Sequence, residues 1–111
     1  MEDCLFCKIV RGEIPSDKVY EDDMVYAFND INPAAPVHVL VIPKKHFDNF
    51  AEADDEYIIA IKKAVETIVR RLGIDEEGYR LVFNTNDNGG QTVHHLHCHI
   101  LGGRFMEWPP G

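Results

Sequence analysis

The segment from residue 95 to residue 101, HLHCHIL, constrains the fold more than any other part of the sequence, because polar and apolar residues alternate along it. Side chains two residues apart lie on the same face of a β-strand. A strand over 95–101 therefore places His95, His97 and His99 on one face and turns the apolar residues between them toward a core. Four of the six histidines fall within residues 94–99, so this strand is also the first candidate for a functional site.

The rest of the pattern predicts two helices and four further strands. Helices are expected over 4–11 and 55–72, and strands over 18–20, 24–29, 37–42 and 79–84. Short connections favour antiparallel neighbours, and 111 residues are the length of one domain. The expected fold class is α+β, a single domain over 1–111 in which the long helix covers a mostly antiparallel, five-stranded sheet. Such a sheet leaves an exposed edge, which a second copy of the chain can cover.

The long helix is the clearest of these elements. Asp54 can cap its start, and acidic residues follow in the first turn, where the helix dipole favours negative charge. Gly73 can adopt the left-handed conformation that ends a helix. Apolar residues recur at helical spacing and predict one buried face, formed by Ile58, Ile61, Val65, Ile68 and Leu72.

Charge, hydropathy and cysteine count argue against several kinds of partner and location. Eleven Lys and Arg against nineteen Asp and Glu give a net charge of −8, which disfavours a nucleic-acid backbone or an anionic membrane surface. No apolar run approaches the ~18 residues of a membrane span, and the start, MEDCLFCK, lacks the basic-then-apolar order of a signal peptide. Together with an odd number of cysteines, three, this predicts reduced thiols and a cytoplasmic protein.

Three imidazoles on one strand face favour chemistry over a structural role. One of them can attack phosphorus while its neighbours hold anionic oxygens and move protons. Alternatively, all three ligate a catalytic zinc ion. The preceding segment 88–92, NGGQT, favours the first interpretation, because permissive backbone, a side-chain amide and a hydroxyl suit a phosphate. His38 lies in an otherwise apolar strand, where it is either a hydrogen-bonded structural residue or a part of the same site.

The N-terminal pair Cys4 and Cys7 has the CxxC spacing of half a zinc site. The same spacing also fits a redox pair, although the βαβ context of thioredoxin-like proteins is missing. A third interpretation is that the two residues are simply small and buried in a helix. Cys98 occupies an apolar position of the 95–101 strand and is expected to pack in the core.

Residues 90–101, GQTVHHLHCHIL, resemble the signature of the histidine-triad family, His-φ-His-φ-His-φ-φ, in which φ is an apolar residue. The chain is similar to the Hint branch, the nucleoside phosphoramidases of this family, in five further segments: 12–15 (GEIP), 19–23 (VYEDD), 38–46 (HVLVIPKKH), 101–103 (LGG) and 108–111 (WPPG). The resemblance implies a homodimer of α+β subunits with a ten-stranded sheet across the interface. It also implies hydrolysis of purine nucleoside 5′-monophosphates that are joined through phosphorus to an amine, as in conjugates of AMP or GMP.

The resemblance also implies roles for single residues. His97, the middle member of the triad, would be the nucleophile that becomes nucleotidylated. His99 would contact the phosphate and assist proton transfer, while His38 and His95 would complete the catalytic histidine network. Asp30 would bind the ribose, and apolar positions would line the base pocket, although pattern alone favours core packing for them. The implied nucleotide-binding set, besides His97 and His99, is Phe6, Ile9, Phe28, Asp30, Ile31, Asn84, Gly90, Gln91 and Thr92.

A structural zinc ion is the cofactor that the resemblance implies. Some members of the wider family carry the same CxxC, completed by two histidines that correspond here to His46 and His95. Cys4, Cys7, His46 and His95 would then form a Cys₂His₂ set. With four protein ligands such a site is closed to substrate, so the metal would be structural. No organic cofactor is expected.

Two alternative functions remain open at this stage. One is a dinucleoside polyphosphate hydrolase, which shares the triad within the same family. The other is an interaction protein that binds purine nucleotides and hydrolyses them only incidentally, because an intact site does not say how it is used.

Overall fold

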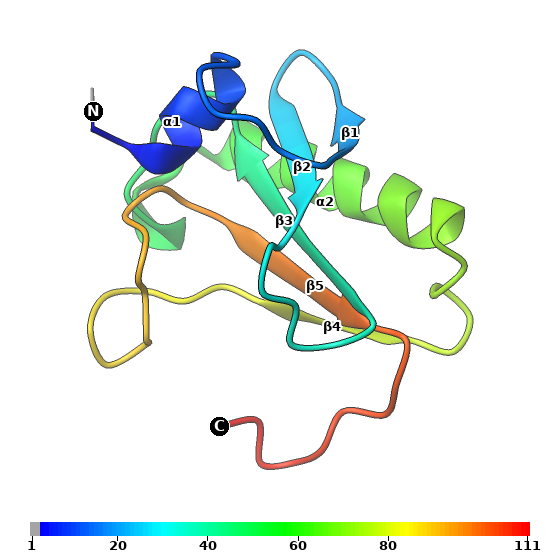
Figure 1. Ribbon diagram of the computed structural model, residues 1–111. Coiled ribbons are helices and arrows are strands. Elements are labelled where there is room, and N and C mark those ends of the chain that lie inside the picture. Colours follow the sequence, from blue (N-terminus) through cyan, green and yellow to red (C-terminus); the bar gives the residue numbers. More distant parts are fainter. Residues whose placement is uncertain (1–2) are drawn as a thin grey trace.

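The computed structural model describes residues 3–111, which form one sheet and two α-helices (Figure 1). The elements in chain order are α1 (Leu5–Val10), β1 (Lys18–Glu21), β2 (Val25–Asn29), β3 (Val37–Pro43), a 3-10 turn (Phe50–Glu52), α2 (Asp55–Arg71), β4 (Tyr79–Val82) and β5 (Cys98–Gly102). The strand order is β1-β2-β3-β5-β4, and every neighbouring pair is antiparallel. The predicted α+β class with one short and one long helix is confirmed.

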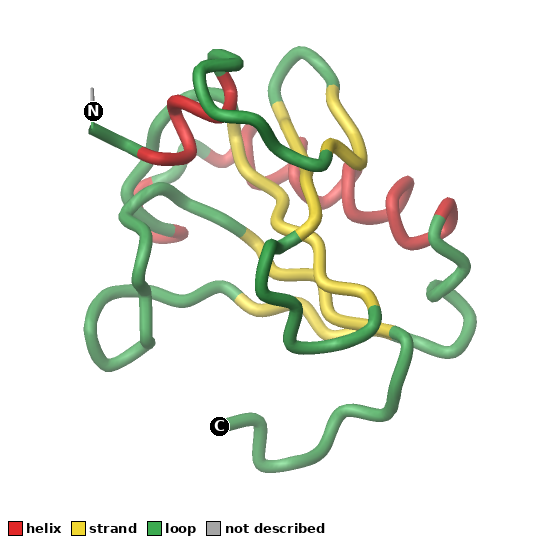
Figure 2. Tube along the Cα trace, in the orientation of Figure 1, coloured by secondary structure: helices red, strands yellow, loops and turns green. Residues whose placement is uncertain are grey.

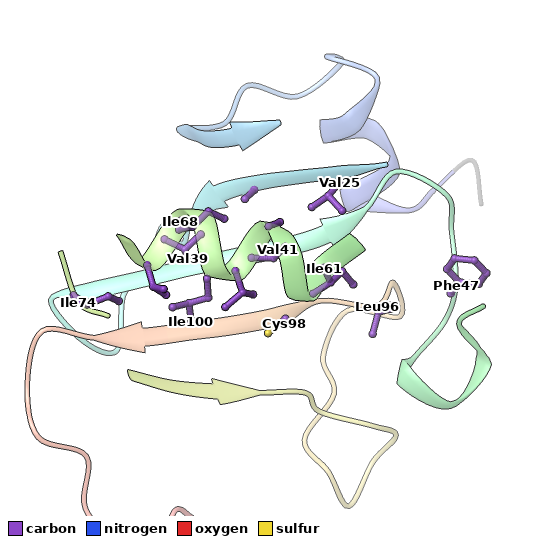
Figure 3. Close-up of a cluster of buried hydrophobic side chains, with 14 residues drawn as sticks. Val25, Val39, Val41, Phe47, Ile61, Ile68, Ile74, Leu96, Cys98 and Ile100 are labelled. Carbon is purple, nitrogen blue, oxygen red and sulfur yellow. The ribbon is translucent and has the colours of Figure 1, made fainter. Parts of the chain in front are cut away.

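Both faces of the central strands are buried, which explains their continuous apolar sequences. Along β3, Val39 and Val41 pack against α2, whereas Leu40 and Ile42 pack in a second cluster with α1. Figure 1 shows α2 running behind the sheet, and Figure 3 shows the core side chains that fill the space between α2 and the strands. The face opposite α2 also carries His38, because it shares the strand parity of Leu40.

The buried face of α2 follows the predicted spacing except at its end. Ile61, Val65 and Ile68 are buried, but the prediction for Leu72 is wrong, since 40% of this residue is exposed. The chain turns at Gly73, whose φ is +69°, and Ile74 enters the core in its place. No helix within residues 3–111 is long and apolar enough to cross a membrane.

The start of α2 also differs from the expectation. Asp54 occupies the N-cap position, but its side chain makes no capping hydrogen bond. Its carboxylate instead lies 3.6 Å from the Lys45 ammonium group. This exposed carboxylate therefore interacts with a lysine outside the helix. Water can satisfy the first N–H groups of α2.

The triad strand is shorter than predicted. β5 begins at Cys98, opposite Val41, so residues 95–97 lie beyond the end of the ladder. The reason is Pro43, which has no N–H to donate and whose carbonyl accepts the ring Nε2–H of His95 at 3.0 Å. The backbone N–H of Leu96 donates to the carbonyl of Phe47 instead, at 2.7 Å.

The strand predicted over 79–84 is also shorter, because β4 ends at Val82. Figure 2 shows that the chain between β4 and β5 is a long loop. The side-chain amide of Asn84 donates to the carbonyl of Gly89 at 2.7 Å and closes this loop. Cys98 and Ile100 nevertheless point into the core on the α2 side, as the alternation predicts.

Candidate active site and metal-binding cluster

A pocket of about 790 Å³ lies between α1 and the sheet face opposite α2. Most of its lining is apolar, and polar groups enter it from the triad segment and from the ends of β1 and β2. It brings together eight residues that sequence reasoning singled out: Phe6, Ile9, Phe28, Asp30, Ile31, Thr92, His97 and His99. An apolar cavity with a few convergent polar groups is the usual form of a small-molecule site.

Five other residues predicted for catalysis or nucleotide binding do not line this pocket, namely His38, Asn84, Gly90, Gln91 and His95. Gln91 is buried, and its side-chain amide donates to the carbonyls of Asp48 and Val93 while its oxygen accepts the N–H of Asn86. These bonds hold the loop before the triad against the segment that follows β3. Gly90, with φ of +75°, provides the turn that this loop requires.

The ring orientation of His97 is fixed by backbone. Its Nδ1 lies 2.8 Å from the carbonyl oxygen of His95, which can only accept a hydrogen bond, so Nδ1 carries the proton. The neutral ring therefore keeps its lone pair on Nε2. Phe6 packs edge-on against the ring, with 5.2 Å between centroids. Because His97 lines the pocket, this arrangement suits a nucleophilic nitrogen.

His38 and His99 form a hydrogen-bonded pair beside it. The backbone N–H of Ala34 donates to His38 Nδ1 at 3.0 Å, so the proton of the neutral ring is on Nε2. That Nε2–H donates to His99 Nδ1 at 2.9 Å, which leaves the His99 proton on its own Nε2. The carboxylate of Asp30 lies 3.5 Å from His38 Nε2. The His99 ring lies 4.9 Å from the His97 ring between centroids, so the pair offers an N–H donor on the ring beside His97, and Asp30 offers a carboxylate that can stabilise an added proton.

Burial favours the neutral forms of His97 and His99. It lowers the pKa of His97, and it lowers the pKa of His99 to about 4, with smaller contributions from His97 and His38. Desolvation disfavours the charged form of a base, and neighbouring imidazoles add repulsion once one of them is charged. A bound phosphate would act in the opposite direction by stabilising an imidazolium.

A second cluster lies at the start of α1. Cys4, Cys7, His46 and His95 place four ligand atoms within 4.8 Å of one another. Their contacts are 3.3 and 3.5 Å from the two sulfurs to His95 Nδ1, 3.4 Å from Cys7 Sγ to His46 Nδ1, and 3.1 Å between the two Nδ1 atoms. Bond lengths of about 2.0–2.3 Å to a tetrahedral zinc ion require ligand atoms roughly 3.3–3.8 Å apart. These four residues are therefore spaced to hold a metal ion.

The donor set also fits a cation chemically. His95 Nε2–H donates to the carbonyl of Pro43, and His46 Nε2–H donates to the Asp48 carboxylate at 2.8 Å, so both Nδ1 lone pairs point into the cluster. Burial lowers the pKa of His95 to about 4 and, with the neighbouring Cys4, raises the pKa of Cys7 to about 11. A metal ion would stabilise both the two facing lone pairs and the thiolate form of Cys7, which the raised pKa otherwise disfavours.

A third group, Asp30, His38 and His99, also has ligand atoms within 4.8 Å of one another. Its two histidines already share a hydrogen bond without a metal, because His38 Nε2 carries the proton that His99 Nδ1 accepts. The three triad histidines likewise do not converge as one ligand set among the described residues. His95 faces the cysteines, whereas His99 faces His38.

Sequence reasoning missed several residues of both sites. Ser16, Asp17 and Asn29 line the pocket from the connection before β1 and from the end of β2. They lie in no periodic pattern, and only the hairpin register brings them to the pocket. Asp48 and Pro43, which orient the two histidines of the metal-binding cluster, were also missed. The proximity of Asp48 to His46 in the sequence is the one signal that points to it.

Comparison with known proteins agrees with this geometry. The model of the HIT domain family matches residues 11–106. The purine nucleoside phosphoramidase of Escherichia coli K12 is 47% identical over 93% of this chain and 89% of its own length. An uncharacterised HIT-like protein of Synechococcus elongatus is 52% identical over 99% of this chain and 98% of its own. The crystal structure of a HIT family hydrolase from Legionella pneumophila superposes with a TM-score of 0.95 at 50% identity, covering 98% of this chain and all of that one. The chain belongs to the HIT domain family.

Proposed function

We propose that this protein is a nucleotide hydrolase that cleaves purine nucleoside 5′-phosphoramidates at the phosphorus–nitrogen bond. The observation that carries the proposal is His97, whose Nδ1–H donates to the His95 carbonyl and whose Nε2 lone pair is left for the pocket. The activity named for the E. coli relative, 47% identical, supports the choice of substrate class. Hydrolysis of dinucleoside polyphosphates by the same His97 is the alternative reaction.

The reaction proceeds in two half-reactions. Neutral His97 attacks the α-phosphorus through Nε2, the bond to the amine breaks, and the protonated His38–His99 pair gives its extra proton to the leaving nitrogen. The phosphate of the substrate favours that protonation, because an anion raises the pKa of a neighbouring imidazole. Water then attacks the nucleotidylated His97, and the pair takes up one proton. A nucleoside monophosphate and an amine leave, and the site returns to its starting state.

The nucleoside part of the substrate fits the remaining lining. Phe6, Ile9, Phe28 and Ile31 supply apolar and aromatic surface for a base, and Asp30 is placed to accept hydrogen bonds from ribose hydroxyls. Ile31 is 91% exposed at the pocket rim, so a bound base would cover it. Asn84, Gly90 and Gln91 act indirectly in this proposal, since they shape the loop that carries Thr92.

The proposed metal ion is zinc, held by Cys4, Cys7, His46 and His95. Two sulfur and two nitrogen ligands are typical of structural zinc sites. Bound there, zinc would tie α1, through Cys4 and Cys7, to His46 after β3 and His95 before β5. Catalysis itself is assigned to the histidines of the pocket.

We also propose that the protein works as a homodimer with a continuous ten-stranded sheet. β4 is an edge strand of the five-stranded sheet, and its Tyr79 and Leu81 are 38% and 43% exposed. Together with Phe50 and Phe83 they border a groove of about 370 Å³ beside α2. An unpaired edge strand with exposed apolar side chains can pair with the same strand of a second copy.

The first experiment uses an adenosine 5′-phosphoramidate that carries a fluorescent amine, with and without a chelator. The native protein is expected to release the amine in both conditions, and His97→Ala to release none. Acid quenching of the native reaction should trap a nucleotide bound to His97, detectable by mass spectrometry. Full turnover by His97→Ala would refute the proposal. Turnover that stops at once with chelator would favour a catalytic metal, and cleavage of diadenosine polyphosphates alone would favour the alternative reaction.

A further inference from the structure

One end of the pocket carries a carboxylate that the proposed chemistry does not use. Asp17 precedes β1, and Asn29 ends β2. The backbone N–H of Asn29 donates to the Asp17 carbonyl at 2.9 Å, and its side-chain Nδ2 donates to Asp17 Oδ2 at 2.8 Å. Two bonds from one residue therefore fix both the backbone and the carboxylate of Asp17 at the pocket lining.

This carboxylate lies at the opposite end of the pocket from the triad. The strand order separates β1 from β5, which carries His99, by three strand spacings. At about 4.8 Å per spacing, the two ends are roughly 14 Å apart. That separation is on the order of the length of a nucleoside monophosphate. With the α-phosphorus at His97, the outer edge of the base therefore reaches the Asp17 end.

At the Asp17 end of the pocket, the polar groups whose hydrogen-bonding role is fixed are acceptors. A carboxylate only accepts hydrogen bonds, and Asn29, whose Nδ2 is engaged with Asp17, has its carbonyl oxygen left for a ligand. The neighbouring Ser16 hydroxyl is bonded to the Tyr26 hydroxyl at 2.6 Å, and a hydroxyl both donates and accepts, so it does not discriminate. The groups of fixed polarity here are acceptors.

We propose that Asp17 makes this pocket select guanine over adenine, an inference that rests on the proposed function. Guanine presents two adjacent donors on its outer edge, N1–H and the 2-amino group, and a carboxylate can accept both. Adenine presents its 6-amino group beside the N1 lone pair, so one carboxylate oxygen would face a lone pair. Once a bound base covers Asp17, which is exposed in the free chain, an oxygen left unpaired in this way disfavours adenine.

The test compares guanosine and adenosine 5′-phosphoramidates that carry the same fluorescent amine. The native protein is expected to favour guanosine by about tenfold in kcat/KM, the discrimination of one good bidentate contact. Asp17→Asn keeps an acceptor for Asn29 but offers one oxygen and one N–H to the base, which matches adenine. The preference is therefore expected to reverse in this variant. Asp23→Asn, an exposed carboxylate in the β1–β2 turn outside the pocket, is the control for charge and should keep the native preference.

Two further measurements separate this inference from the proposed function. Affinities for GMP and AMP, measured by calorimetry, report the base preference without any chemistry. Asp17→Ala removes both hydrogen-bonding patterns and should bind the two nucleotides equally. Native protein that hydrolyses neither phosphoramidate, but binds GMP more tightly than AMP through Asp17, would refute the proposed hydrolysis and support guanine selection by Asp17. Equal affinity of the native protein for both, or an equal loss of both in the folded Asp17→Asn variant, overturns the inference.

Discussion

At the scale of single residues, two backbone groups decide how the histidines of this site can react. The His95 carbonyl places the His97 proton on Nδ1, and the Ala34 N–H places the His38 proton on Nε2. The consequence is a lone pair on His97 Nε2 and, through the hydrogen bond from His38, an N–H on Nε2 of His99. Side-chain identity alone does not give this arrangement. It depends on the backbone just before β5 and in the loop between β2 and β3.

The burial of His99 predicts a specific dependence of stability on pH. The pKa of His99 is lowered to about 4 in the folded chain, while an unfolded histidine has a pKa near 6.5. The unfolded state therefore binds more protons between these values, so the stabilisation is complete above about pH 6.5 and declines as the pH falls toward 4. His97, His38 and Asp30 face His99 and contribute to the same balance.

Comparing native protein with His99→Gln isolates this contribution. Between pH 7 and pH 5 the native protein is expected to lose about 2 kcal/mol more unfolding free energy than the variant does. Urea unfolding at both pH values measures it, and any loss of metal in acid affects both proteins alike. Equal losses in the two proteins would contradict the assignment of a neutral, buried His99.

At the scale of elements, α1 links the two sites. This six-residue helix carries Cys7, with Cys4 as its N-cap, and it also contributes Phe6 and Ile9 to the pocket. A helix this short has little stability of its own, so its position depends on what it is tied to. Metal binding at one of its faces is therefore expected to hold the pocket wall formed by the other.

The double substitution Cys4→Ser and Cys7→Ser tests this link. Elemental analysis should find one zinc per chain in native protein and none in the variant, and urea unfolding should show lower stability. Calorimetry should show weaker AMP binding, because Phe6 and Ile9 are less firmly placed. Cys98→Ala is the matched control, since Cys98 is buried away from the metal-binding cluster. Native protein without zinc, or a variant with unchanged AMP affinity, would contradict the link.

The helices and strands also separate what apolar patterns in the sequence predict from what they do not. Period-3.6 apolar spacing predicted the long helix, and period-two alternation predicted the side of β5 that meets the core, because burial acts on every residue of these segments. Short apolar runs between turn and stop residues predicted the short helix and the other strands. The end of the β5 ladder was missed because it depends on Pro43, a residue of another strand. Asp17 and Asn29 were missed for a similar reason. Their place at the pocket follows from a hairpin register and leaves no mark on local composition.

At the scale of the whole molecule, the β4 edge of the sheet, one of its two edges, lacks a strand partner in the described chain. Tyr79 and Leu81 of β4 are partly exposed, and together with Phe50 and Phe83 they border the groove beside α2. Solvent exposure of such a surface costs free energy that burial against a second copy recovers. The same association would extend the antiparallel sheet from five strands to ten.

Leu81→Lys is expected to break this association. A charge in the centre of the edge would be buried without a partner, which strongly disfavours the dimer while leaving the exposed monomer position tolerant of lysine. Sedimentation analysis should show twice the chain mass for native protein and the single chain mass for the variant. Leu72→Lys is the matched control, because Leu72 is exposed to a similar degree, 40%, at the far end of α2 and outside the groove. A native protein that sediments as a monomer, or an L81K variant that remains dimeric, would show that β4 is not the interface.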